Sequence, residues 1–261
     1  MAQERRFRLT DRLPRELGPS DVAPNHPNAL SFLTEAEVLQ GWLMPNASNY
    51  TFLVELCWDN EHGYGIYKPQ TGEAPLRDFP TGTLYRRECA AYAASQWLGW
   101  SLVPPTVQRT GELGIGSLQL YVPPLAESHY FVVREEYPAE ALRMGVFDIV
   151  VNNADRKAGH CFEAQTGGIW GIDHGLTFHV APKLRTVIWD FGGQRVPASL
   201  LGDLRGFAAE LATAGSEAVA ELKEWTSFEE VQALSRRIDA LLSEPVMPEP
   251  NSRRDLPWPW F

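Results

Sequence analysis

The sequence predicts an α+β fold with two lobes, a small β-rich N-lobe followed by a mainly helical C-lobe. Alternating and β-branched apolar runs gather between residues 42 and 122, around one helical pattern. Apolar residues recur at helical spacing over 138–151 and from residue 198 onward, and 261 residues suffice for two lobes. The predicted parts are an N-terminal arm over 1–30, an N-lobe over 31–123, a C-lobe over 124–245 and a C-terminal tail over 246–261.

Composition narrows the class of protein. The chain is 44% hydrophobic and carries a net charge of −10, which argues against nucleic acid as a main partner. Its first residues are too charged for a signal peptide, and no apolar run approaches the roughly 18 residues of a transmembrane segment. Three widely spaced cysteines do not suggest a disulfide framework, so a reducing, cytoplasmic location is expected.

The N-terminal arm is polar and contains proline, so we expect it to be loosely held. After it, Thr34-Glu35-Ala36-Glu37 matches a helix capping box and predicts a short helix that ends near Gly41. Two strands should follow, over 42–44 and 50–58, joined by the turn P-N-A-S-N. Backbone N–H groups and short hydroxyls of such a turn can cradle phosphate, although a plain hairpin turn fits the same residues.

A charged pair is expected in the N-lobe. Residues 59–63 should form a turn, and the strand that follows over 64–68 should end with Lys68. A helix should run from Thr81 or Thr83 to about Leu98, before Gly99. Glu88 lies on or beside the packed side of that helix, where an acid needs a partner. Lys68, 20 residues earlier (88 − 68), is one candidate, and the neighbouring Arg86 and Arg87 are the others.

The segment from 106 to 151 should contain a hairpin with a glycine-rich turn, a connecting stretch and a helix. The second strand of the hairpin, over 117–122, leads into the linker between the lobes, and residues 124–137 form the passage between them. The helix is expected over 138–151, with proline at its first turn and Asp148 near its end. Asp148 could face the interior or the solvent.

The most informative stretch runs from Asn152 to Phe178 and contains two loop aspartates, Asp155 and Asp173, each at the edge of a short apolar strand. They are 18 residues apart (173 − 155), enough for a hairpin that brings them close together. Phosphoryl transfer needs such a pair, because one carboxylate positions the attacking group while the other holds Mg²⁺ against the nucleotide phosphates. The simpler alternative is two aspartates in ordinary turns.

The motifs N-A-D-R-K-A-G-H and I-D-H-G resemble the catalytic core of the atypical kinases. The likeness is to the phosphatidylinositol 3-/4-kinase-like family, with the type II phosphatidylinositol 4-kinases and HipA-type kinases, in which a D-R-x-x-x-N loop precedes a strand ending I-D-N-G. It covers roughly residues 40 to 245 and is most specific over 148–175. It implies a two-lobed, protein-kinase-like fold that binds ATP and Mg²⁺ between its lobes.

The resemblance also assigns residues. By it, Asp155 has the catalytic-loop role, Asp173 binds the metal, and Asp148 braces the loop. Lys68 would contact the α- and β-phosphates, with Glu88 as the residue that orients it. The remaining assignments are to nucleotide contacts: Ser48 and Asn49 to the phosphates, and main-chain groups of Tyr121 and Val122 to the adenine edge.

One position departs from the family pattern. His160 stands where the second metal-binding asparagine is usual, and an imidazole suits Mg²⁺ less well than an oxygen ligand does. Either His160 takes the place of the asparagine, or the site uses one metal, or the protein binds nucleotide without ordinary transfer. The letters D-F-G at 190–192 lie 35 residues after Asp155 (190 − 155), too far for the metal-binding motif, so Asp173 is preferred.

After Pro197 the pattern is helical, over 198–213, 216–225 and 227–242, and a capping box begins at Ser227. The proline- and tryptophan-rich tail is expected to fold back onto the C-lobe, although a docking peptide fits it as well.

The function expected from these residues is ATP- and Mg²⁺-dependent transfer of the γ-phosphoryl group. The acceptor stays open among a lipid, a protein and a small molecule, because the cysteine-rich palmitoylated stretch of type II lipid kinases has no counterpart in this sequence. The alternatives are a nucleotide-binding pseudokinase scaffold and an AMP transferase on the same fold. A metal-dependent hydrolase using His160, His174 and His179 is disfavoured, because these histidines lack a recognised ligand spacing.

Overall fold

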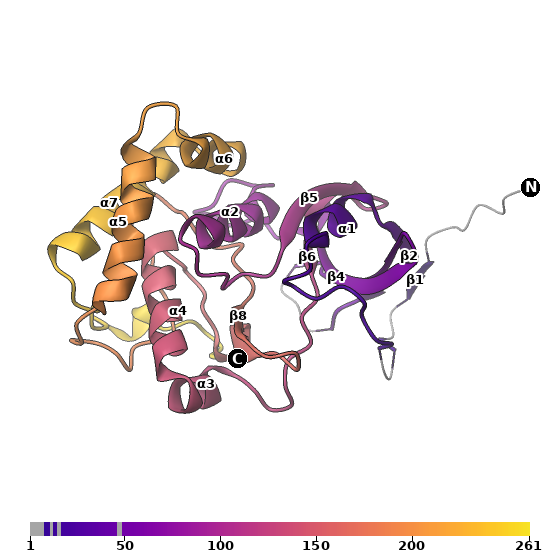
Figure 1. The fold of residues 1–261 in the computed structure, drawn as a ribbon, viewed down its shortest axis with the longest axis horizontal. Coiled ribbons are helices and arrows are strands. Elements are labelled where there is room, and N and C mark those ends of the chain that lie inside the picture. Colours follow the sequence, from indigo (N-terminus) through magenta and orange to yellow (C-terminus); the bar gives the residue numbers. More distant parts are fainter. Residues whose placement is uncertain (1–7, 11–12, 15–16, 46–48) are drawn as a thin grey trace, which may run out of the picture. The chain divides into compact units, whose positions relative to one another are not determined.

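The computed structural model describes residues 8–10, 13–14, 17–45 and 49–261 (Figure 1). The chain divides into two compact units. The first runs to Cys89 and resumes over 104–122, and the second comprises 90–103 and 123–261. The first unit is rich in β-structure and the second is mainly helical, which confirms the predicted α+β architecture.

A six-stranded sheet forms most of the first unit, in the order β1-β2-β3-β4-β6-β5. β1 is parallel to β2, and the other neighbouring strands are antiparallel. The short helix α1 (Ala29–Glu35) packs against β3, β5 and β6 and closes a core in which Phe32, Leu33 and Leu56 are 0% exposed. The strands are β1 (Arg8–Thr10), β2 (Glu37–Leu43), β3 (Phe52–Trp58), β4 (Glu61–Pro69), β5 (Thr106–Gly111) and β6 (Gly114–Leu120).

The helix predicted from Thr34 to Gly41 is wrong. Helix α1 ends at Glu35, and β2 begins at Glu37 and pairs with β3 as far as Leu43↔Phe52. The Thr34 hydroxyl donates backward to the Leu30 carbonyl (2.8 Å), so it does not cap a following helix. The apparent capping box is therefore the end of one helix, and strand pairing determines the conformation after it.

The described parts of the predicted arm are not loosely held. Arg8–Thr10 form β1, which pairs with β2 at Arg8↔Gln40 through Thr10↔Trp42. Val22 is 2% exposed in the core of the first unit, and the Asp21 carboxylate accepts the His62 N–H at 2.8 Å. Local polarity did not reveal these contacts, because they are made with strands distant in the sequence.

The hairpin that ends with Lys68 is confirmed, although its second strand is longer than predicted. β3 and β4 are joined at Trp58↔Glu61 by Asp59 and Asn60, whose φ angles are 50° and 65°. Two successive left-handed residues are typical of a tight hairpin turn, and Asp and Asn tolerate that conformation. The turn sets the register of β4 on β3, and on its other side β4 pairs with β6, where Lys68 lies opposite Ser117.

Helix α2 (Leu84–Trp97) is the predicted helix that carries Glu88. Gly99 has a φ of +68° just after it, the left-handed conformation expected for a glycine that ends a helix. The residues of α2 up to Cys89 belong to the first unit, and those from Ala90 belong to the second, where Ala90 and Ala94 are fully buried.

Five helices and a short hairpin account for the regular structure of the second unit beyond α2, within the described residues. The helices are α3 (Tyr130–Glu136), α4 (Pro138–Val151), α5 (Ala198–Ala212), α6 (Glu217–Trp225) and α7 (Phe228–Ser243), and the hairpin strands are β7 (Cys161–Glu163) and β8 (Ile169–Gly171). α4 has the predicted bounds, whereas α3 lies in a stretch for which no helix was predicted. The capping box at Ser227 is present, with mutual bonds to Glu230 of 2.9 and 3.2 Å.

The last residues of the chain fold back onto the second unit, as predicted. They form a 3₁₀ turn, η3 (Arg253–Asp255), and then an extended run in which the Trp260 carbonyl accepts the Ala158 N–H at 2.7 Å.

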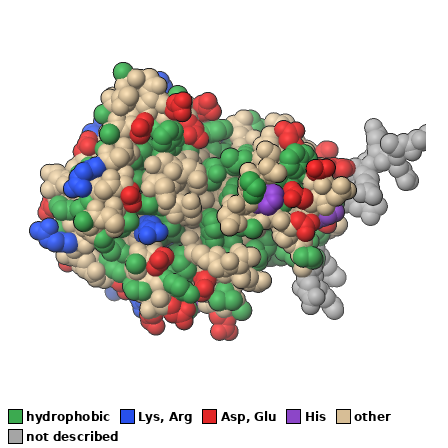
Figure 2. All heavy atoms as spheres, viewed as in Figure 1, with side chains coloured by type: hydrophobic (Ala, Val, Ile, Leu, Met, Phe, Trp, Pro, Cys, Tyr) green, Lys and Arg blue, Asp and Glu red, His purple; other side chains and the backbone are tan. Residues whose placement is uncertain are grey.

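The surface is acidic on balance. On the face shown in Figure 2, Asp and Glu side chains are scattered widely and Lys and Arg side chains stand in small groups, in keeping with the net charge of −10. No helix among the described residues is long and apolar enough to cross a membrane.

Candidate active site

An ion pair in the first unit joins the lysine and the glutamate that the sequence singled out. Lys68 lies near the end of β4 and Glu88 in the second turn of α2, and Lys68 Nζ is 2.5 Å from Glu88 Oε1. The Glu88 side chain is 3% exposed and that of Lys68 is 23% exposed. The predicted pairing is therefore confirmed. Arg87, a competing partner, stacks its guanidinium over the Phe79 ring, 4.9 Å from its centroid.

The other predicted nucleotide contacts of the first unit stay predictions. Ser48 lies outside the described residues. Asn49, three residues before β3, is bonded to the segment that follows β4, because its Oδ1 accepts the Ala74 N–H at 2.7 Å. The Tyr121 N–H donates to the Tyr64 carbonyl at 2.9 Å, so an adenine contact from Tyr121 would have to use its carbonyl. Val122, 4% exposed, is the other residue predicted to meet adenine.

In the second unit, the end of α4 fixes the loop that carries Asp155. Asn152 has a left-handed φ of 55° and ends the helix. The next residue, Asn153, donates from Nδ2 to Asp148 Oδ1 and accepts the Asp155 N–H on Oδ1, both at 3.0 Å. Asp148 is 0% exposed, so its alternative placement on the surface is wrong. The backbone at Asp155 is thus positioned through Asn153 by a carboxylate in the helix.

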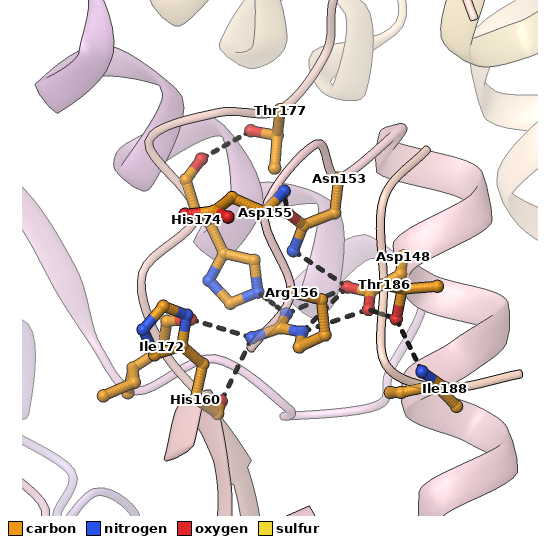
Figure 3. A network of polar contacts seen from close by, with 10 residues as sticks. All are labelled: Asp148, Asn153, Asp155, Arg156, His160, Ile172, His174, Thr177, Thr186 and Ile188. Carbon is orange, nitrogen blue, oxygen red and sulfur yellow. Dashed lines mark hydrogen bonds and ion pairs between the residues drawn. The ribbon is translucent and has the colours of Figure 1, made fainter. Parts of the chain in front are cut away.

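A buried arginine extends this bracing to Ile172, the residue before Asp173 (Figure 3). The Arg156 side chain is 0% exposed, and its Nε and Nη2 donate to the Asp148 carboxylate at 2.9–3.1 Å. Its Nη1 donates to the carbonyls of His160 (3.0 Å) and Ile172 (2.8 Å). Burial is the largest single influence and lowers the pKa of Arg156, but the charge of Asp148, its hydrogen bonds and smaller contributions from Cys161 and Asp173 together raise the pKa. One side chain therefore ties α4 to both aspartate loops.

His174 completes the network. Its Nε2 lies 2.7 Å from Arg156 Nη2, and because a guanidinium can only donate, the imidazole must accept at Nε2 and carry its proton on Nδ1. The approach is close: a Cβ at Gly171 would lie 2.8 Å from Met144 and 3.5 Å from Arg156 Nη2. A side chain at this position of β8 would therefore require the end of the Met144 side chain to move, while its contact with the guanidinium would be an ordinary one.

The β7–β8 hairpin brings His160 and Asp173 together. Its register is Cys161↔Gly171 through Glu163↔Ile169, and His160 Nε2 lies 3.4 Å from Asp173 Oδ2. Asp173 has a φ of 59°, and its side chain is 46% exposed. The conformation turns the chain sharply after the strand.

Asp155 lies near a second carboxylate and a lysine. Burial raises the pKa of Asp155, Lys157 lowers it, and the negative charge of Asp173 raises it further. Lys157 Nζ is 3.4 Å from Asp155 Oδ2. The charge of Asp173 therefore reaches Asp155 and disfavours its ionisation, whereas convergence of the two carboxylates on one metal site stays a prediction.

The D-F-G letters are not part of this cluster, as the sequence analysis concluded. Asp190 accepts the buried Tyr130 hydroxyl on Oδ2 and the Arg134 guanidinium on Oδ1, both at 2.6 Å. Burial and the bond to Asp190 together raise the pKa of Tyr130. Asp190 therefore joins its segment to α3. It also borders a cavity of about 300 Å³. None of the predicted site residues lines this cavity, which is lined by Phe131, Arg134, Val187, Trp189, Asp190, Leu256 and Trp260.

The sequence predicted no role for Asn153 or Lys157, and His174 was named only as a ligand of the disfavoured metal-dependent hydrolase. Asn153 had a signal, since an Asn two residues before a loop residue commonly accepts its N–H. Lys157 stood two residues after the predicted catalytic aspartate. No sequence pattern indicated the contact of His174 with Arg156, because that contact depends on the hairpin that folds residues 160–173.

The fold is two-lobed and kinase-like. Hydra Fam20 with sugar is similar in structure, with a TM-score of 0.53 at 14% identity over 82% of this chain and 87% of that chain. The Helicobacter pylori proinflammatory kinase CtkA gives a TM-score of 0.49 at 12% identity, over 82% and 94% of the two chains.

The chain belongs to the family of the Mycobacterium tuberculosis protein Rv2133c. The two are 40% identical over 251 residues, which cover 83% of this chain and 89% of that protein. No family model matches the sequence.

Proposed function

We propose that this chain is an ATP- and Mg²⁺-dependent phosphotransferase of the phosphatidylinositol 3-/4-kinase-like group, acting on a hydroxyl of a lipid, protein or small molecule. The Lys68–Glu88 ion pair carries the proposal. In kinases, a strand lysine held by a helix glutamate contacts the α- and β-phosphates of ATP. Here the two side chains are 2.5 Å apart in a chain of kinase-like fold, and Lys68 retains 23% exposure. Asn49, Tyr121 and Val122 are the further nucleotide contacts we propose.

Asp155 is the group that orients the acceptor hydroxyl and takes up its proton. Burial raises the pKa of Asp155, and this favours proton acceptance in the transition state. The Lys157 ammonium, 3.4 Å from that carboxylate, places positive charge where negative charge accumulates on the transferred phosphoryl group. The braced loop supplies the fixed geometry on which such catalysis depends.

Asp173, with His160, is the proposed metal site. The charge of Asp173 disfavours ionisation of Asp155, and a divalent cation would offset the negative charge of the two carboxylates. Within the described residues no three His, Cys, Asp or Glu side chains converge, so Mg²⁺ would complete its coordination with phosphate oxygens and water, as it does in nucleotide enzymes. The cation would offset the charge of the nucleotide phosphates.

Labelled ATP tests the function directly. The full-length protein is incubated with Mg²⁺ and either α- or γ-labelled ATP, together with purified lipids or a cell extract as acceptors. We expect γ-label, and not α-label, in an acceptor. Transfer of α-label would instead establish an AMP transferase, and nucleotide binding without any transfer would establish a pseudokinase scaffold.

A pair of variants tests the metal assignment. Asp173→Asn should weaken Mg-ATP binding in calorimetry, whereas binding equal to that of the wild type would remove Asp173 from the metal site. His160→Asn introduces the family's usual oxygen ligand and should preserve or raise transfer if His160 holds the cation. A large loss of transfer in this variant would show that the imidazole has a role that an amide cannot fill.

A further inference from the structure

Residues 253–261, which we call the strap, lie along the loop 155–160, which we call the catalytic loop. The Trp260 carbonyl accepts the Ala158 N–H at 2.7 Å. A Cβ on Gly159 would lie 4.0 Å from Phe261 Cδ1, so the Phe261 ring lies beside the next residue of the loop. The same ring meets His129 edge-on, with centroids 5.2 Å apart. The strap therefore joins the catalytic loop to the start of α3.

The other end of the strap is attached to the segment that holds the catalytic loop from its opposite side. The Asp255 carbonyl accepts the Thr186 N–H (3.1 Å) and the Trp189 indole N–H (3.2 Å). Thr186 forms a parallel bridge with Arg156, whose N–H donates to the Arg185 carbonyl at 2.9 Å and whose carbonyl accepts the Val187 N–H at 3.1 Å. The loop is thus held at Arg156 by residues 185–187 and at Ala158 by the strap.

The bond at Ala158 controls a buried donor. Ala158 is 0% exposed in the intact chain, and the Trp260 carbonyl is the acceptor that pairs its N–H there. Removal of the strap would leave this N–H to water or to another acceptor, and the loop would lose a restraint on its backbone. Ala158 is three residues from Asp155 and two from Arg156, with no regular strand between them. A displacement of about 1 Å at a catalytic group can lower the rate by about 10²-fold.

We infer that the strap is a positioning element of the active site: the Trp260 carbonyl and the Phe261 ring hold the catalytic loop so that Asp155 is correctly placed. The inference rests on the proposed function for its catalytic consequence, while the physical restraint on the loop can be measured without any activity. The strap contacts the loop of the second unit, whereas Lys68 lies in the first, so its removal should alter turnover more than nucleotide affinity.

Three variants and one control define the experiment. Deletion of residues 259–261 removes both contacts, Phe261→Ala removes the ring, and Phe261→Leu retains an apolar side chain that can still cover Gly159. Phe228→Ala is the matched control, because Phe228 is 51% exposed and Phe261 is 60% exposed, yet Phe228 begins α7 and its recorded ring contact is with Lys223. Amides of α7 serve as an internal reference for global unfolding.

Two measurements are made on each full-length or truncated protein. Hydrogen exchange of residues 155–160 should accelerate at least tenfold in the deletion variant and less in Phe261→Ala, with Phe261→Leu and Phe228→Ala near the wild type. Release or transfer of γ-label from Mg-ATP should show kcat lowered by about tenfold to 10²-fold in the deletion variant, with KM for ATP changed less than threefold.

Unchanged hydrogen exchange over 155–160 in the deletion variant would contradict the inference that the strap restrains the loop. So would accelerated exchange with an unchanged kcat, since the strap would then have no positioning role. A fall in kcat that Phe228→Ala reproduces would likewise count against it. An intact chain that transfers no label would instead overturn the proposed function, and the exchange rates alone would then decide whether the strap restrains the loop.

Discussion

The two units each contain an ion pair between a helix residue and a residue of another segment, but the two pairs differ in solvent exposure. Asp148 and Arg156 are both 0% exposed, and Asp148 also accepts from Asn153 and Thr186. In the first unit, Glu88 is 3% exposed and Lys68 is 23% exposed. The Asp148–Arg156 pair is therefore fully buried, whereas the Lys68–Glu88 pair is partly exposed to solvent at its lysine.

This difference separates a structural pair from one suited to a ligand. The planar guanidinium of Arg156 distributes its donors among a carboxylate and two carbonyls, and this geometry suits the joining of several segments. The ammonium of Lys68 is a compact charge on a flexible stem and, being partly exposed, can meet a phosphate. The buried pair should therefore govern stability, and the open pair should govern activity.

The largest expected effect is on stability, from Asp148→Ala. The variant leaves a fully buried guanidinium without its carboxylate, which typically costs about 3–5 kcal/mol of unfolding free energy. Urea unfolding of the second unit, followed by tryptophan fluorescence, measures this loss of unfolding free energy.

Arg134→Ala is the control, because its ion pair with Asp190 has a length of 2.6 Å but both side chains are more than 30% exposed. We expect the control to lose about 1 kcal/mol or less. Equal losses in the two variants would contradict the comparison.

The second effect is on activity, from Lys68→Met. Removal of one preorganised cationic donor typically lowers kcat by about 10²–10³-fold, and the apolar stem that packs beside the sheet is kept. Glu88→Gln retains the shape and an acceptor for Lys68, so its loss should be smaller, about tenfold. Steady-state transfer of γ-label measures both. Wild-type transfer by Lys68→Met would separate the pair from catalysis and remove the observation on which the proposed function rests.

The sequence allowed prediction of those parts of the site that depend on local pattern. The hairpin turn at Asp59-Asn60, the bounds of α4 and the glycine that ends α2 follow from preferences of single residues or of helical periodicity. The Lys68–Glu88 pair followed from a buried acid that required a partner.

The rest depended on contacts between distant segments. β2 replaced a predicted helix because its residues pair with β3, and the capping pattern at Thr34 contains no information on that pairing. The burial of Asp148, the bond between Arg156 and His174 and the strap on Ala158 all join residues brought together by folding. A single sequence identifies the charged residues of such a network, but it does not identify their partners.

The smallest expected effect is on the melting temperature, from Asp155→Asn, which removes a partly buried carboxylate. Burial raises the pKa of Asp155, Lys157 opposes the shift and Asp173 adds to it, so ionised Asp155 destabilises the folded state. Because the folded pKa is raised, the penalty is full above that pKa and vanishes as the pH falls below the unfolded value of about 3.9. Asp155→Asn should therefore raise the melting temperature at pH 7 and lose that advantage near pH 4, while transfer activity is abolished.

Asp239→Asn, on the exposed face of α7, is the control and should show no such pH-dependent gain in melting temperature. A lower melting temperature of Asp155→Asn at pH 7 would mean that the contact with Lys157, 3.4 Å away, outweighs burial, and Asp155 would then belong with the stabilising charges of the network.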